Sequence, residues 1–182
     1  VAQFTLVGPD PIWRSDALAR LWVLLRFFTI LSNLFLGGVM LGVALGTRPG
    51  PDLLATATLA ILLVGAVYHT LLARDLTGPA WWADQGLHTA TPVLAALWWL
   101  AFGGHGLRLS RLWAWLTWPK AFCVYALGRG QIDGIYPYFF LDVGRFGWAQ
   151  VGLNIVGLVA AFAAAGVLLW LSARALGRTA AA

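Results

Sequence analysis

Residues 151–171 read VGLNIVGLVAAFAAAGVLLWL and contain no charged side chain. A helix needs roughly 20 apolar residues to cross about 30 Å of hydrocarbon, so this stretch predicts a membrane-spanning helix. Similar apolar stretches precede it at about residues 21–45, 53–73, 87–102 and 112–127. We therefore expect an all-α fold: a polytopic transmembrane helix bundle with five complete spans, forming a single transmembrane domain over residues 1–182.

The overall composition favours the same class. Hydrophobic residues make up 60% of the chain and charged residues 10%, against about 45–50% and about 25% in a soluble domain. The one cysteine, Cys123, cannot form an intrachain disulfide, which excludes a disulfide scaffold. The net charge of +5 comes from basic residues scattered singly along the chain, so nucleic acid is not an expected partner.

The first residues resemble the end of another span. Residues 1–8 read VAQFTLVG, and the segment Pro9-Asp10-Pro11 follows them. Proline fixes the backbone and removes an amide donor, so a helix is expected to end there. We expect residues 1–8 to be the tail of a sixth, N-terminal span; the alternatives are a surface strand or a cloning remnant.

Polar side chains near the spans gather at one end of the bundle, which we call face A. Its loops lie near residues 9–20, 74–86 and 128–147, and we expect the long aromatic segment 128–147 to lie across it. Polar groups inside a bilayer are costly and are therefore functional candidates. The candidates at face A are Arg26, Thr29, Asn33, Asp84, His88, Tyr136 and Asp142.

The spacing of these residues suggests acyl-transfer chemistry. Arg26, Thr29 and Asn33 share one helical stripe, and Asp84 and His88 are four residues apart. A threonine hydroxyl within about 2.6–3.2 Å of a histidine can act as a nucleophile with a general base. Thr29 and His88 are the candidate pair, with Arg26, or backbone amides and the Asn33 amide, to stabilise an oxyanion.

The sequence leaves two candidates for the carboxylate that would complete such a triad. Asp84 lies one turn before His88 and Asp142 comes from the long loop, so both are open as the carboxylate. No cluster of His, Cys, Asp or Glu has the spacing of metal ligands. We expect no metal and no cofactor, although His69 and His88 leave haem or pigment ligation as an alternative.

Other functions compete with catalysis. Thr29 can bond its own helix carbonyl, and Arg26 can extend to lipid phosphate. Gly38, Gly42 and Gly46 are four apart and allow a second backbone to approach. That pattern suits a non-catalytic accessory or structural subunit with protein partners in the membrane. A transporter is less favoured, because the polar groups do not continue away from face A.

Three segments resemble a known family in order and spacing. They are Leu25-Arg26-Phe27-Phe28-Thr29-Ile30, Gly86-Leu87-His88-Thr89-Ala90-Thr91-Pro92 and Ile135-Tyr136-Pro137-Tyr138-Phe139-Phe140-Leu141-Asp142. The chain is similar to the androgen-induced-protein family, which includes the androgen-dependent TFPI-regulating protein, and most of all to its bacterial six-span members. The similarity extends from about Arg20 to Leu171.

This resemblance implies a function for the candidates. Eukaryotic members are multi-pass threonine hydrolases that cleave fatty acid esters of hydroxy fatty acids, which makes Thr29 the nucleophile and His88 its base. The likeness favours Asp142, where the human proteins have Glu, as the third member. It also implies a sixth span, a membrane lipid or fatty-acyl ester as the substrate, and a bacterial cytoplasmic membrane as the location.

Overall fold

The computed structural model describes residues 17–179. These residues form helices and turns, with an isolated bridge between Leu107 and Thr179. The predicted span tail at residues 1–8 lies outside them. In chain order the elements are α1 (Ala17–Leu24), α2 (Phe28–Ala44), α3 (Pro51–Val67), η2 (Tyr68–Leu72), α4 (Gly78–Gln85), η3 (Gly86–Ala90), α5 (Thr91–Phe102), η4 (Leu109–Arg111), α6 (Leu112–Trp115), α7 (Thr117–Asp133), η5 (Phe139–Leu141) and α8 (Val143–Ala175).

The all-helical class is confirmed, and part of the span pattern with it. The continuous helices over Pro51–Leu72 and Val143–Ala175 are long and apolar enough to cross a membrane. A third span results if α1 and α2 are counted together. α7 has 17 residues, fewer than the roughly 20 that a perpendicular span requires. The count of five spans therefore stays a prediction.

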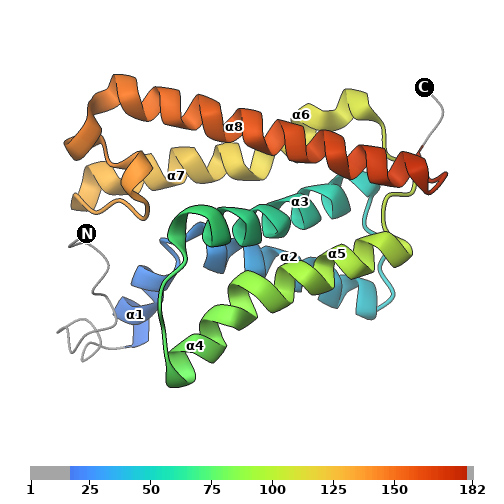
Figure 1. Ribbon diagram of the computed structural model, residues 1–182, viewed down its shortest axis with the longest axis horizontal. Helices are drawn as coiled ribbons and strands as arrows, with labels where there is room; N and C mark the ends of the chain where they lie inside the picture. Colours follow the sequence, from blue (N-terminus) through green and yellow to red (C-terminus); the bar gives the residue numbers. More distant parts are fainter. Residues whose placement is uncertain (1–16, 180–182) are drawn as a thin grey trace.

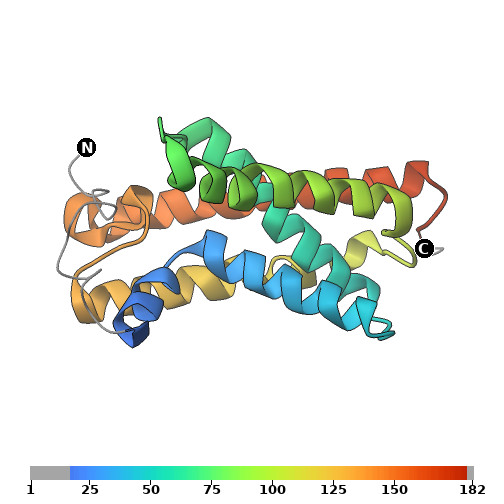
Figure 2. The same cartoon turned by 90° about the horizontal axis from the view of Figure 1, so that it is seen from below.

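Helix α3 is the centre of the bundle. Of its most apolar stretch 61% is buried, against 17% for α8. Figure 1 shows α3 between the α7–α8 pair and α5, and Figure 2 shows it crossing between α2 and α5. Small residues on α3 permit this close packing. A Cβ on Gly65 would lie 3.0 Å from Pro92 Cβ and 3.1 Å from the His88 carbonyl oxygen.

The expectation of one helix over residues 21–45 is wrong at its start. The chain turns by 95° between α1 and α2, although Leu25-Arg26-Phe27 contains neither proline nor glycine. Side chains of α7 hold the corner: the Tyr125 hydroxyl donates to the Leu25 carbonyl at 2.9 Å, and Arg129 donates to the Trp22 carbonyl. These bonds satisfy carbonyls that a helix end leaves without partners.

The remaining boundaries differ from the prediction mostly by extension. The helix expected from residue 87 begins at Gly78, α7 continues to Asp133, and α8 begins at Val143 with a kink at Gly147. Only residues 134–142 of the expected loop connect helices. This segment folds back over the helix ends, as expected. Two of its side chains, Tyr138 and Leu141, are buried.

Two π-helical turns, η2 and η3, lie at the same end of the molecule. Such turns occur often at functional sites. In the second one, the Thr91 hydroxyl and backbone N–H both donate to the Gly86 carbonyl, five residues earlier, the hydroxyl at 2.8 Å. Pro92 follows directly and has no N–H for the His88 carbonyl, four residues before it. The consequence is a widened turn that contains His88.

Candidate active site

Thr29 and His88 meet, as the sequence analysis expected. Thr29 lies in the first turn of α2, and its Oγ1 is 3.2 Å from Nε2 of His88 in η3. The other ring nitrogen, Nδ1, lies 3.2 Å from Asp84 Oδ1 and 3.1 Å from the Asp84 carbonyl oxygen. These two Asp84 oxygens are both acceptors when the carboxyl group is ionised, so Nδ1 carries the hydrogen of a neutral imidazole ring. Nε2 is then free to accept the Thr29 proton.

Asp84 is the carboxylate that contacts the imidazole. The two side chains are four residues apart on one helix face, and each is 14% exposed. Tyr68 of η2 donates its hydroxyl to Asp84 Oδ2, and its ring stacks on His88 with centroids 3.9 Å apart. Tyr68 therefore fixes both partners. The arrangement Thr29–His88–Asp84 has the connectivity of a nucleophile, a base and an orienting carboxylate.

Asn33 lies beside this triad in a positioning role. Its amide Nδ2 donates to the Thr29 carbonyl at 2.9 Å and to the Leu87 carbonyl at 3.4 Å. The amide thus links α2 to η3 directly behind the reacting pair. Because these bonds occupy its donors, Asn33 holds the elements together rather than facing an oxyanion.

The corner before α2 exposes the start of that helix. Phe27 is extended, with φ −92° and ψ 133°, so Phe28 and Thr29 are the first helical residues. Unsatisfied N–H groups and the helix dipole make such an end electropositive. The Tyr138 hydroxyl accepts from the Phe28 N–H at 3.1 Å and also contacts Thr29. Burial raises the pKa of Tyr138, so this hydroxyl keeps its proton.

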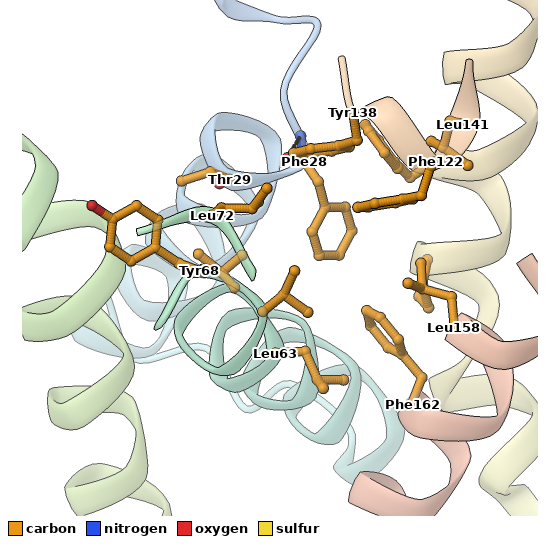
Figure 3. Close-up of a pocket in the computed structure, with 14 residues that line it drawn as sticks. Phe28, Thr29, Leu63, Tyr68, Leu72, Phe122, Tyr138, Leu141, Leu158 and Phe162 are labelled. Carbon is orange, nitrogen blue, oxygen red and sulfur yellow. Dashed lines mark hydrogen bonds between the residues drawn. The ribbon is translucent and has the colours of Figure 1, made fainter. Parts of the chain in front are cut away.

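An apolar pocket opens beside Thr29 (Figure 3). The cavity volume is about 40 Å³, and the lining is almost wholly apolar. The Tyr68 hydroxyl points away from the other lining residues in Figure 3. The labelled lining residues from α2, α3, α7, the loop and α8 include Phe28, Thr29, Leu63, Phe122, Tyr138, Leu141, Leu158 and Phe162.

Three predicted supporting residues lie elsewhere in the fold. Arg26 is buried at the corner between α1 and α2, where Nη2 pairs with Asp133 Oδ2 at 2.6 Å and Nη1 donates to the Ile135 carbonyl. The Tyr136 hydroxyl accepts from Gln131 Nε2 at 2.6 Å. Asp142 caps α8 by accepting from the Arg145 N–H at 3.1 Å. Their bonds are structural, and Asp84 rather than Asp142 contacts His88.

Two tyrosines of the site did not emerge from the sequence. Tyr68 precedes His69 at the end of an apolar stretch, and Tyr138 lies within the third resemblance segment beside the chosen Tyr136. The one sequence signal for either tyrosine was its position at the end of a predicted span. Tyrosines that only anchor a helix at the membrane interface occupy the same position, so the signal does not indicate a site residue. Neither position shows from sequence spacing that its hydroxyl reaches Asp84 or the start of α2.

A second threonine–histidine pair lies nearby. His69 Nε2 is 3.0 Å from the Thr89 hydroxyl, which donates to Gln85 Oε1 at 2.8 Å. The Nε2 atoms of His69 and His88 thus face different threonines, an arrangement unlike a shared haem or pigment site. Over residues 17–179, no group of three or more His, Cys, Asp or Glu side chains could hold a metal ion.

Comparisons of the chain with protein-family models, with curated proteins and with solved structures found no match.

Proposed function

We propose that this protein is an integral membrane hydrolase of fatty-acyl esters, such as fatty acid esters of hydroxy fatty acids. Thr29 is the nucleophile, His88 the general base and Asp84 the orienting carboxylate. The observation that carries the proposal is the 3.2 Å contact between Thr29 Oγ1 and His88 Nε2, with Nδ1 held on Asp84. Thr29 also lines an apolar pocket.

The reaction follows from this arrangement. His88 Nε2 takes the hydroxyl proton as Thr29 Oγ1 bonds the ester carbonyl carbon. The tetrahedral intermediate then loses the alcohol oxygen, to which His88 returns the proton, and the acyl group stays on Thr29. Water attacks the acyl-threonine with His88 again as the base. The products are a fatty acid, an alcohol and free Thr29.

The pocket supports a fatty-acyl substrate rather than a polar one. Its walls are almost wholly aliphatic and aromatic side chains, and Thr29 lies among them. Burial of a methylene group in such surroundings contributes about 0.8 kcal/mol. The cavity volume is about 40 Å³, so a long acyl chain gains this affinity only where the lining side chains move apart, with its carbonyl beside Thr29.

Covalent labelling tests the nucleophile. A long-chain alkyl fluorophosphonate should add one phosphonyl group to the purified protein, detected by intact mass, and peptide mapping should place it on Thr29. Thr29→Ser should still label, because its hydroxyl remains. Thr29→Ala should not label, while the matched Thr89→Ala should label like the wild type.

Undiminished labelling of Thr29→Ala would contradict the assignment. If neither labelling nor turnover of any fatty-acyl ester occurs in the wild type, the hydrolase proposal fails. Stable co-purification with other membrane proteins would then favour the accessory-subunit alternative.

A further inference from the structure

The Tyr138 hydroxyl lies at the start of α2, directly beside the proposed nucleophile. We infer that Tyr138 is a catalytic residue, whose O–H donates a hydrogen bond to the ester carbonyl oxygen as negative charge develops there. This inference rests on the proposed hydrolase function and adds the group that stabilises the oxyanion. The two side chains expected in that role donate to other groups. Arg26 donates to Asp133 and the Ile135 carbonyl, and Asn33 donates to the carbonyls of Thr29 and Leu87.

The hydrogen-bond pattern leaves the Tyr138 proton available. The oxygen accepts from the Phe28 N–H at 3.1 Å, and a phenol oxygen keeps its own hydrogen for donation while it accepts. The hydroxyl is also hydrogen-bonded to the side chain and backbone of Thr29, and Tyr138 is one of the residues that line the pocket. An ester carbonyl attacked by Thr29 would therefore lie within reach of this donor.

Packing holds the ring in one orientation. Tyr138 is 8% exposed, stacks on Phe140 with an interplanar angle of 3°, and makes edge contacts to Phe27 and Phe122. A donor fixed before the reaction stabilises the transition state without reorganisation. The N–H groups of α2 behind the phenol oxygen polarise its O–H bond, which makes the hydroxyl a stronger donor.

The bond changes are balanced without a further reactant. The carbonyl π electrons move to oxygen as Thr29 Oγ1 adds, and the Tyr138 hydrogen bond shifts onto that oxygen while its O–H bond stays intact. When the carbonyl re-forms, the electrons return and the leaving alcohol receives the proton held by His88. The same donor acts again during hydrolysis of the acyl-threonine.

The matched variants are Tyr138→Phe and Tyr136→Phe. Both remove one hydroxyl from the same loop, but that of Tyr136 bonds Gln131 on α7. With a purified wild type that turns over a p-nitrophenyl acyl ester, Tyr138→Phe should lower kcat about 10²–10³-fold, the range for loss of one oxyanion donor. KM should change little, and Tyr136→Phe should resemble the wild type.

A pair of inhibitors separates catalysis from folding. An alkyl trifluoromethyl ketone forms an oxyanion adduct with the nucleophile, whereas the matching alkyl methyl ketone binds without one. Tyr138→Phe should weaken the first by about 100-fold and leave the second unchanged. Equal kcat in Tyr138→Phe and wild type, or equal weakening of both ketones, would overturn the inference alone. A wild type without turnover overturns the hydrolase proposal and this inference with it.

Discussion

The two threonine–histidine pairs at face A differ in the direction of their hydrogen bonds. At Thr29–His88, Nδ1 faces Asp84, so Nε2 accepts from the threonine. At His69–Thr89, the threonine proton goes to Gln85, so the histidine donates. His69 is exposed, whereas His88 is largely buried under Tyr68. A histidine beside a threonine is therefore not sufficient for base catalysis. The partner of its other ring nitrogen decides whether the nitrogen that faces the threonine can accept a proton.

The largest expected effect separates the two hydroxyls. Thr29→Ala should abolish turnover of a fatty-acyl ester, because no other group replaces the nucleophile, while Thr89→Ala should keep it. Thr29→Ser should retain part of the activity, since serine keeps the hydroxyl but lacks the methyl that restricts χ1. Steady-state rates of the purified proteins measure this. Equal losses in Thr29→Ala and Thr89→Ala would remove the distinction between the pairs.

The second effect separates the two histidines. His88→Gln should lower the rate about 10²–10⁴-fold, the range for loss of a general base, whereas His69→Gln should leave it within a few-fold. Binding of a non-hydrolysable alkyl ketone checks that His88→Gln retains its pocket. The proposal does not survive if wild type and His88→Gln hydrolyse the ester equally well.

Acidification sharpens the same comparison. A proton on His88 Nε2 removes the acceptor for Thr29, so the rate should fall on the acid side of the pH profile. The His69–Thr89 contact needs a hydrogen on Nε2 and keeps it after protonation. Wild type and His69→Gln should share one acid limb, and the residual rate of His88→Gln should lack it. If the acid limb moves in His69→Gln, the limb belongs to His69 rather than to His88.

Tyr68→Phe should have a smaller effect. It removes the bond to Asp84 but keeps the ring on His88. A hydrogen bond contributes about 0.5–1.5 kcal/mol net, which corresponds to at most about tenfold in rate. The control is Tyr125→Phe, which removes a hydroxyl bond at the α1–α2 corner instead. A loss as large as that of His88→Gln would mean that Tyr68 does more than orient Asp84.

The last expected effect is one on stability, at the contact between α3 and η3. Gly65→Ala places a methyl group 3.0 Å from Pro92 Cβ, so the turn that carries His88 must shift by a few tenths of an ångström. We expect stability to fall by about 1–3 kcal/mol, the usual range for overpacking, measured by denaturant unfolding in detergent. Gly38→Ala is the control, since a Cβ there contacts nothing within 4 Å. A Gly65→Ala protein as stable as the control would show that this contact can relax.

The sequence by itself determined the all-helical class and named Thr29 and His88 as the candidate pair of the site. Hydropathy is a sum over neighbouring residues, so the apolar stretches are visible without a structure. Polar groups are rare among them, which limited the candidates to a few, including Thr29 and His88. The spacing of four on one helix also made Asp84 one of the two candidates for the carboxylate beside His88.

Only the tertiary structure decided how these parts are held. The corner at residues 25–27 contains no local helix breaker, and Tyr125, Arg129 and Asp133, about a hundred positions later in the chain, stabilise it. The choice of Asp84 over Asp142, and the places of Tyr68 and Tyr138, likewise depend on which helix ends meet. Periodicity and hydropathy describe one segment at a time, whereas these contacts join segments whose separation along the chain carries no signal of their proximity.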